Sequence, residues 1–143
     1  MMKEITIDNK MMGYIAIFER LTHVELKECL ENDEMVLFIV GEKRLADIFN
    51  RNKNIVTELK EKVNKHILMA ETSRDLLMFV KNLFYRYGVK EIDITWKENV
   101  TDILVSVETT EIGKAIGKEG KNIKLLRDAV GRFFPIHSIN IKQ

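Results

Sequence analysis

The chain has 143 residues, of which 45% are hydrophobic, 31% are charged and one is proline. This composition argues against disorder, and the length allows one sizeable core or two small cores of about 70 residues each. The 23 basic and 22 acidic residues give a formal net charge of +1, so a nucleic-acid partner would have to meet a local basic patch. Cys29 is the only cysteine, which excludes an internal disulfide and a multi-cysteine zinc site.

The sequence carries no signal for a membrane or for secretion. No apolar run approaches the roughly 20 residues that span a bilayer. The N-terminal segment Met1–Ile5 also lacks the apolar core of a signal peptide. We therefore expect a cytoplasmic protein with no membrane partner.

The first half of the chain predicts a helix, two strands, two helices and a strand. Asp8, after Ile5–Ile7, fits the N-cap of a helix that runs to about Thr22. The uninterrupted apolar run Met35–Val40 is typical of a buried strand. The other expected elements are a strand from Val24 to Cys29, a short helix over 44–49, a helix over 53–63 and a strand over 66–69.

The second half predicts the same order of elements. Thr72 and Asp75 resemble the capping box of a helix that runs from Ser73 to Tyr87 and stops at Gly88. The remaining expected elements are strands over 92–96 and 103–107 joined by a polar turn over 97–101, two helices on either side of a glycine turn, and a last strand over 136–141.

The two halves also share a short motif. Lys53-Asn54-Ile55 returns as Lys121-Asn122-Ile123, and the same offset places the strand 36–40 on 104–108. Two related units are the economical explanation of this repeat. We predict an α+β protein with a first domain over residues 1–71 and a second domain over residues 72–143.

The segment from Ile112 to Ile123 has the features of a phosphate-binding turn between two helices. Glycines at 117 and 120 allow a positive φ and leave no Cβ in the way of a ligand. Free N–H groups at the start of the second helix, together with the helix dipole, favour an anion. The spacing is neither that of a dinucleotide fingerprint nor that of a P-loop.

This turn resembles the Gly-x-x-Gly loop of the KH module, which clamps about four nucleotides of single-stranded RNA. The phrase from Ala115 to Lys124 is similar to the second KH domain of NusA transcription factors. A helix before two strands is the order of the prokaryotic-type (type II) KH fold, so each half is expected to be helix–strand–strand–helix–helix–strand. The resemblance to archaeal NusA covers nearly the whole chain.

The resemblance implies a single-stranded RNA-binding factor in transcription elongation, termination or antitermination, with RNA polymerase or its elongation complex as a second partner. Bases are expected to lie in a groove formed by three apolar residues of the segment and the strand 136–141. The expected RNA-binding residues are Lys114, Ala115, Ile116, Gly117, Lys118, Glu119, Gly120, Lys121, Asn122, Ile123 and Lys124.

The first domain departs from the KH pattern, because Phe49-Asn50-Arg51-Asn52 stand where the second domain has Gly117–Gly120. Asn52 tolerates a left-handed backbone and is expected to keep the turn. Phe49 is expected to pack inward, with stacking on a base as the alternative. Arg51 and Lys53 are expected to offer secondary RNA contacts.

Two other interpretations stay open. The chain could keep the KH fold as an interaction protein that docks on RNA polymerase or the ribosome and binds RNA weakly, or it could be a phosphate-dependent enzyme. The three histidines are far apart, and neither paired carboxylates nor a nucleophile with a base is apparent. We therefore expect no catalytic residue, no metal and no cofactor. Trp96 is expected to be partly buried, with RNA stacking as the alternative.

Overall fold

A computed structural model of the chain describes residues 9–143. The N-cap expected at Asp8 lies outside this range, but the helix that follows it runs to Thr22 as predicted. Within residues 9–143 no helix is both long and apolar enough to cross a bilayer. The helices are α1 (Asn9–Thr22), α2 (Arg44–Arg51), α3 (Ile55–Val63), α4 (Leu76–Phe84), α5 (Ile112–Ile116) and α6 (Lys121–Gly131). The strands are β1 (Leu26–Glu31), β2 (Met35–Val40), β3 (His66–Glu71), β4 (Val89–Lys97), β5 (Val100–Val107) and β6 (Ser138–Ile141).

The strands form two sheets of the same topology, in the orders β1-β2-β3 and β4-β5-β6. In each sheet the first two strands are antiparallel and the third pairs parallel to the second. Each sheet also belongs to one helix–strand–strand–helix–helix–strand unit. The fold is therefore α+β with two tandem KH units, as the sequence predicts.

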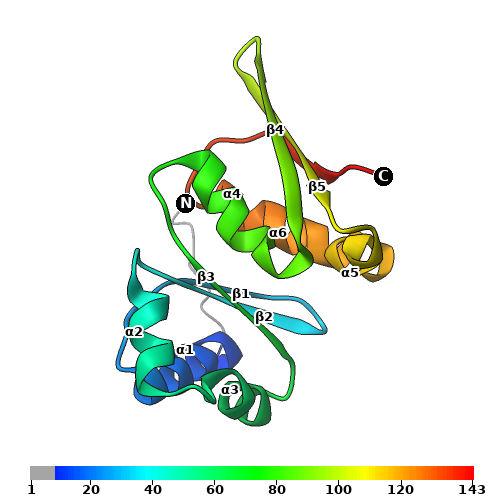
Figure 1. Cartoon of the computed structure of the whole chain (residues 1–143). Helices are drawn as coiled ribbons and strands as arrows, with labels where there is room; N and C mark the ends of the chain where they lie inside the picture. Colours follow the sequence, from blue (N-terminus) through cyan, green and yellow to red (C-terminus); the bar gives the residue numbers. More distant parts are fainter. Residues whose placement is uncertain (1–8) are drawn as a thin grey trace, which may run out of the picture.

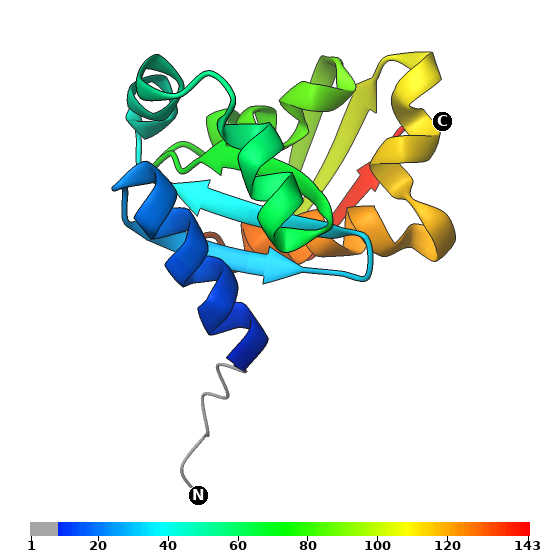
Figure 2. The same ribbon diagram turned by 90° about the horizontal axis from the view of Figure 1, so that it is seen from below.

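The two units stack in four layers (Figure 1). Helices α1 and α3 cover one face of the first sheet, and α4 and α6 lie between the two sheets. Phe18 of α1 stacks on Phe38 of β2 with ring centroids 4.7 Å apart. Figure 2, which is turned by 90°, shows the helices of the second unit on the far side of β1 and β2.

Strand β2 is buried along its whole length because both faces of its sheet are covered. Val36, Phe38 and Val40 pack among the helices of the first unit. Met35, Leu37 and Ile39 alternate with them and pack against α4 and α6 of the second unit. The uninterrupted apolar run thus reflects two separate cores, one on each face.

Helix α4 joins the units into one body. Its residues Phe79, Val80, Leu83 and Phe84 are fully buried in a cluster that draws side chains from both sheets. The division at residues 71 and 72 stays a prediction, although it falls between the end of β3 and the start of α4.

Several predicted boundaries were wrong. Helix α4 begins at Leu76 and not at Ser73, because Asp75 is its N-cap and accepts a hydrogen bond from Leu77 N. The Thr72 N–H instead extends the sheet by donating to Val40 O at 2.8 Å. The C-terminal end tightens into a 3₁₀ turn over Tyr85–Tyr87.

The offset that aligns the two helix pairs is wrong by one residue in the central strands. Val36 faces the helices of the first unit. In the second unit, Ile103 faces the helices and Leu104 points to the other face of the sheet. A slip of one residue exchanges the two faces of a strand, so the true partner of Val36 is Ile103.

Strands β4 and β5 are longer than predicted and meet in a two-residue turn. Glu98 and Asn99 have φ values of 51° and 66°, as a tight hairpin of this kind requires. The hairpin projects beyond the helices (Figure 1) and leaves Trp96 69% exposed. Partial burial of Trp96 was therefore a wrong expectation. The last strand starts at Ser138, two residues later than predicted.

Candidate nucleic-acid interface

The turn between α5 and α6 is built by glycine. Gly117 ends α5 with φ 77° and ψ 171°, a backbone conformation that is essentially restricted to glycine. Its N–H donates to Gly113 O at 2.8 Å. A Cβ at position 117 would lie 2.8 to 2.9 Å from three atoms of Asn122. The helix must therefore stop here, and the position must carry no side chain.

The rest of the turn is left-handed and open. Glu119 and Gly120 have φ values of 58° and 74°, and helix α6 starts at Lys121. A Cβ at Gly120 would meet only the Ile123 side chain, at 3.9 Å. Lys118 and Glu119 are exposed, so the tip of the turn is accessible to a ligand.

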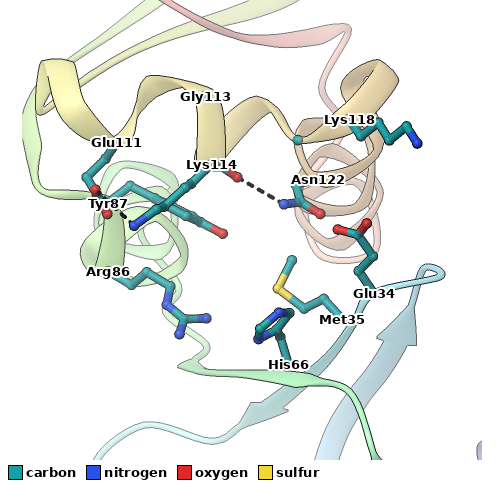
Figure 3. A pocket seen from close by; sticks show the side chains of 11 residues that line it. Glu34, Met35, His66, Arg86, Tyr87, Glu111, Gly113, Lys114, Lys118 and Asn122 are labelled. Carbon is teal, nitrogen blue, oxygen red and sulfur yellow. Dashed lines mark hydrogen bonds and ion pairs between the residues drawn. The ribbon is translucent and has the colours of Figure 1, made fainter.

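The four lysines of this segment differ in their surroundings. Lys118 and Lys124 are exposed and make no ion pair with any part of the chain from residue 9 onwards. Figure 3 shows that Lys118 points away from the cavity beside the turn. Lys114 is exposed and lies 3.6 Å from Glu111.

Lys121, which the sequence analysis assigns to the RNA-binding residues, is already held in an ion pair. Its Nζ lies 2.6 Å from Oδ2 of Asp33 in the turn between β1 and β2. This contact lowers the pKa of Asp33 and raises the pKa of Lys121, chiefly through their shared hydrogen bond.

Asn122 connects the elements around the turn. Its Nδ2 donates to Lys114 O at 2.9 Å (Figure 3). Its Oδ1 accepts a hydrogen bond of 2.9 Å from Nδ2 of Asn32 in the β1–β2 turn. Sequence reasoning missed Asn32 and Asp33, because no local pattern connects the β1–β2 turn with a segment so distant in the chain.

The apolar side of the segment only partly matches the expected groove. Ala115 is completely buried in the shared core, so the assignment of Ala115 to the groove lining was wrong. Ile116 and Ile123 are half-buried against the same core and remain accessible at the surface. Helices α5 and α6 both contact β6, the strand expected to form the opposite wall.

A cavity of about 570 Å³ lies on the other side of α5, between the two units (Figure 3). Its walls are of mixed charge, with basic, acidic and amide groups around an apolar patch. The lining residues are Glu34, Met35, His66, Arg86, Tyr87, Glu111, Gly113, Lys114, Gly117, Lys118 and Asn122.

The corresponding loop of the first unit is a different structure. Helix α2 continues through Arg51, and Asn52 is extended with φ −149°, so the expected left-handed turn at Asn52 is absent. The Asn52 side chain accepts from Asn54 N and donates to Glu58, which links α2 to α3. Phe49 does not pack inward as predicted, because 37% of its surface is exposed.

The two secondary RNA contacts expected in this loop differ in their freedom. A guanidinium nitrogen of Arg51 lies 3.5 Å from Thr22 O at the end of α1. Lys53 is exposed. Neither residue adjoins an open glycine backbone of the kind found at 117–120.

One cluster with the residue types of a hydrolase lies at the start of β6. Asp102 accepts hydrogen bonds from Ser138 Oγ at 2.6 Å and from His137 Nδ1 at 2.9 Å. Both bonds lower the pKa of Asp102. A nucleophilic serine would have to face the histidine, whereas Ser138 donates to the carboxylate. This arrangement is therefore a surface hydrogen-bond cluster.

The repeated unit and its glycine turn define a protein with two KH domains in tandem. The family described as NusA-like second KH domain matches residues 76–143. A Thermoplasma acidophilum protein named probable transcription termination protein NusA is 61% identical over 142 residues, with 99% of each chain covered. The protein of that name from Halococcus morrhuae is 26% identical over 138 residues, covering 96% of this chain and 98% of its own.

A solved structure described as the crystal structure of APE1850 is also similar. It has a TM-score of 0.66 and 28% sequence identity, and the match covers 92% of this chain and 96% of that one. The chain belongs to the NusA family.

Proposed function

We propose that this protein is a transcription factor that binds single-stranded RNA through the turn 117–120 of its second KH unit. The observation that carries the proposal is the open glycine backbone at the start of α6, flanked by Lys118 and Lys124, which are exposed and have no ion pair within residues 9–143. A helix start offers free N–H groups to phosphate, and KH modules bind RNA through such a loop.

In this mechanism the sugar-phosphate backbone lies against Gly117–Gly120, and Lys118 meets a phosphate. Lys124 and Lys114 add attraction that salt weakens. The bases turn toward Ile116 and Ile123 and the neighbouring strand β6. The proposed contact set keeps all the predicted residues of 114–124 except Ala115, and Asn122 acts mainly by holding the turn together.

The proposed biological setting is transcription elongation and termination. Its support is that the relatives from Thermoplasma acidophilum and Halococcus morrhuae are named as probable transcription termination proteins. A single open clamp and a net charge of +1 favour modest RNA affinity. Binding to RNA polymerase would raise the effective concentration of the RNA and compensate for this. The proposed action involves no catalysis.

One observation favours a second candidate, an interaction protein that docks on a protein partner and binds RNA weakly. Trp96 is 69% exposed on the projecting β4–β5 hairpin. Tryptophan is enriched at the centres of protein–protein interfaces, so an exposed tryptophan on a projecting hairpin suits a protein partner. The titration below separates the two candidates.

The test is a salt-dependent titration of a short unstructured RNA with the wild type and the double variant Lys118→Asp/Glu119→Asp. Aspartate tolerates the left-handed backbone at position 119, and both positions are exposed, so the fold is preserved. We expect at least about tenfold weaker binding and a shallower salt dependence, by about 0.7 in the logarithmic slope for each phosphate that the variant no longer neutralises.

Lys62→Asp is the matched control, because it makes the same change of net charge at an exposed position of α3 in the first unit. An affinity decrease below about twofold is expected there, since exposed charges at this distance are screened. Equal decreases in both variants would show that net charge alone governs binding. Unchanged affinity in the loop variant would overturn the proposal and favour the interaction protein.

A further inference from the structure

The β1–β2 turn of the first unit reaches the start of α6 in the second unit (Figure 2). Two consecutive residues of this turn make the contact. Asn32 bonds to Asn122 and to the Lys121 carbonyl, and Asp33 pairs with Lys121. Both partners immediately follow the glycine turn proposed to hold RNA.

Asn32 uses both ends of its amide. Its Oδ1 accepts from the backbone N–H groups of Glu34 and Met35 at 2.9 and 2.8 Å, which shapes the β1–β2 turn. Its Nδ2 donates to Asn122 Oδ1 at 2.9 Å and to Lys121 O at 3.3 Å. The orientation of the amide is therefore fixed, with the oxygen toward its own turn and the nitrogen toward the second unit.

Asn122 in turn contacts both sides of the glycine turn. Its Nδ2 is bonded to Lys114 O in α5, and its side chain fills the space that a Cβ on Gly117 would need. A chain of hydrogen bonds thus runs from Asn32 through Asn122 to α5, and it spans the two ends of the turn 117–120.

Asp33 neutralises a charge beside the glycine turn and does not fix the conformation of the turn. It holds the Lys121 ammonium at 2.6 Å, and 77% of the Asp33 side chain is exposed, so a ligand can reach the pair from solvent. An RNA phosphate that approaches the start of α6 meets a lysine already occupied by a carboxylate.

We propose that the β1–β2 turn of the first unit is part of the RNA-binding site of the second unit. Asn32 is a positioning residue that fixes the glycine turn, and Asp33 is a counter-ion that an RNA phosphate replaces on Lys121. The inference rests on the proposed function of residues 117–120. It gives the first unit a role in RNA binding that does not depend on its own loop.

The first test is Asn32→Asp. The remaining oxygen still accepts from Glu34 and Met35, so the β1–β2 turn is kept, whereas the donor to Asn122 and Lys121 O is removed. Removing two hydrogen bonds that hold the turn is expected to weaken RNA binding about three- to tenfold. Faster amide hydrogen exchange at residues 118–121, with unchanged exchange in β2, is expected to accompany the weaker binding.

The Asn122→Ala background shows whether Asn32 acts through Asn122. If it does, Asn32→Asp has little further effect on affinity once Asn122 is truncated. Full additivity of the two substitutions would overturn the positioning role, and so would unchanged affinity and loop exchange in Asn32→Asp.

The second test is Asp33→Asn, with Asp128→Asn as a control that removes the same charge from α6. Freeing Lys121 is expected to tighten RNA binding about threefold at low salt, because the phosphate no longer has to displace an exposed carboxylate, and this gain should shrink as the salt concentration rises. The same increase in affinity in both variants would show a general charge effect and overturn the counter-ion role.

These outcomes are separable from failure of the proposed function. If the wild type binds no RNA, the function itself is wrong. If the wild type binds and Lys118→Asp/Glu119→Asp does not, the function stands, and Asn32→Asp and Asp33→Asn then decide the inference alone.

Discussion

The two KH units have the same topology but surround their central strands differently. In the first unit the residues of β2 that face away from its own helices are Met35, Leu37 and Ile39, and all three are buried under the second unit. In the second unit the corresponding residues of β5 are Asp102, Leu104 and Ser106, which are partly exposed on a face that no other helix or strand of residues 9–143 covers. The second unit thus covers the first, and its own sheet stays open to solvent.

The loops between the paired helices differ in the same sense, because the second unit again has the more exposed backbone. Gly117 and Gly120 break the helix and expose the backbone, whereas α2 continues through Arg51 and leaves no open turn. The unit that is buried on both faces thus lacks the open loop, and the unit with one free face has it. We infer that the second unit presents the loop that holds the ligand, and that the first unit supports this loop through its β1–β2 turn.

Phe79→Ala tests the shared core and has the largest expected effect. Phe79 is fully buried in α4 and packs edge-on against Phe133 at 5.1 Å. Truncating a buried phenylalanine lowers the free energy of unfolding by about 3–5 kcal/mol. Because the core is common to both units, hydrogen exchange should speed up in β2 and in β5 alike. Destabilisation confined to one sheet would mean that the units unfold independently.

The sequence predicts this architecture well where the signal is local. The apolar run Met35–Val40 marks the doubly covered strand, and the glycines at 117 and 120 mark the break between α5 and α6. The repeat also reveals two units of one topology. These features follow from backbone preferences and periodicity, which act over a few residues.

The features that sequence reasoning got wrong or missed depend on tertiary contacts. Asp33 and Lys121 pair across the units, and nothing in either segment identifies the other. Asn52 has the residue type for a left-handed turn but is used instead to link α2 to α3. Trp96 is exposed because its hairpin extends past the helices. The sequence pattern predicts strands that are shorter than the observed ones, so it does not reveal this extension.

Gly117→Ala and Gly120→Ala sharpen the comparison within the open loop. Alanine at 117 meets Asn122 below 3.0 Å and has a forbidden backbone conformation, so the free energy of unfolding should fall by about 2–3 kcal/mol. Alanine at 120 makes only an ordinary contact with the Ile123 side chain at 3.9 Å, so its cost is the left-handed strain of about 1–2 kcal/mol. Urea denaturation measures both. Equal effects would show that the contact with Asn122 does not restrain the turn.

Gly113→Ala is the control for these substitutions. The position lies inside α5 with nothing near the added methyl group, so alanine should be neutral or slightly stabilising.

Phe49→Gly/Asn52→Gly tests whether two glycines are enough to give the first unit an RNA-binding loop. The end of α2 and the Asn52 bonds to Asn54 and Glu58 should weaken, which lowers the free energy of unfolding by about 1 kcal/mol. No increase in RNA affinity is expected, because no hydrogen bond described in the first unit corresponds to those that Asn122 makes with Lys114 and Asn32. A clear increase would mean that the two loops differ only in their glycines.

Asp102→Asn tests the open face of the second sheet and has the smallest expected effect. The hydrogen bonds from Ser138 and His137 hold the pKa of Asp102 below its ordinary value of 3.8. A carboxylate with a lowered pKa stabilises the fold above about pH 4, and this contribution disappears as the pH falls through the folded-state value. Asp102→Asn should therefore lower the melting temperature slightly near neutral pH, and the difference from the wild type should shrink as the pH falls below about 4.

The position in the first unit that corresponds to Asp102 is Met35, and it shows why a stabilising carboxylate is possible only in the second unit. The pair Asp102 and Ser138 opens the parallel ladder between β5 and β6, and the pair Met35 and His66 opens the ladder between β2 and β3. Methionine at 35 packs under the second unit, so no carboxylate can be accommodated there without burying its charge. A melting difference for Asp102→Asn that persists unchanged to low pH would show that the side-chain shape, and not the charge, stabilises this edge.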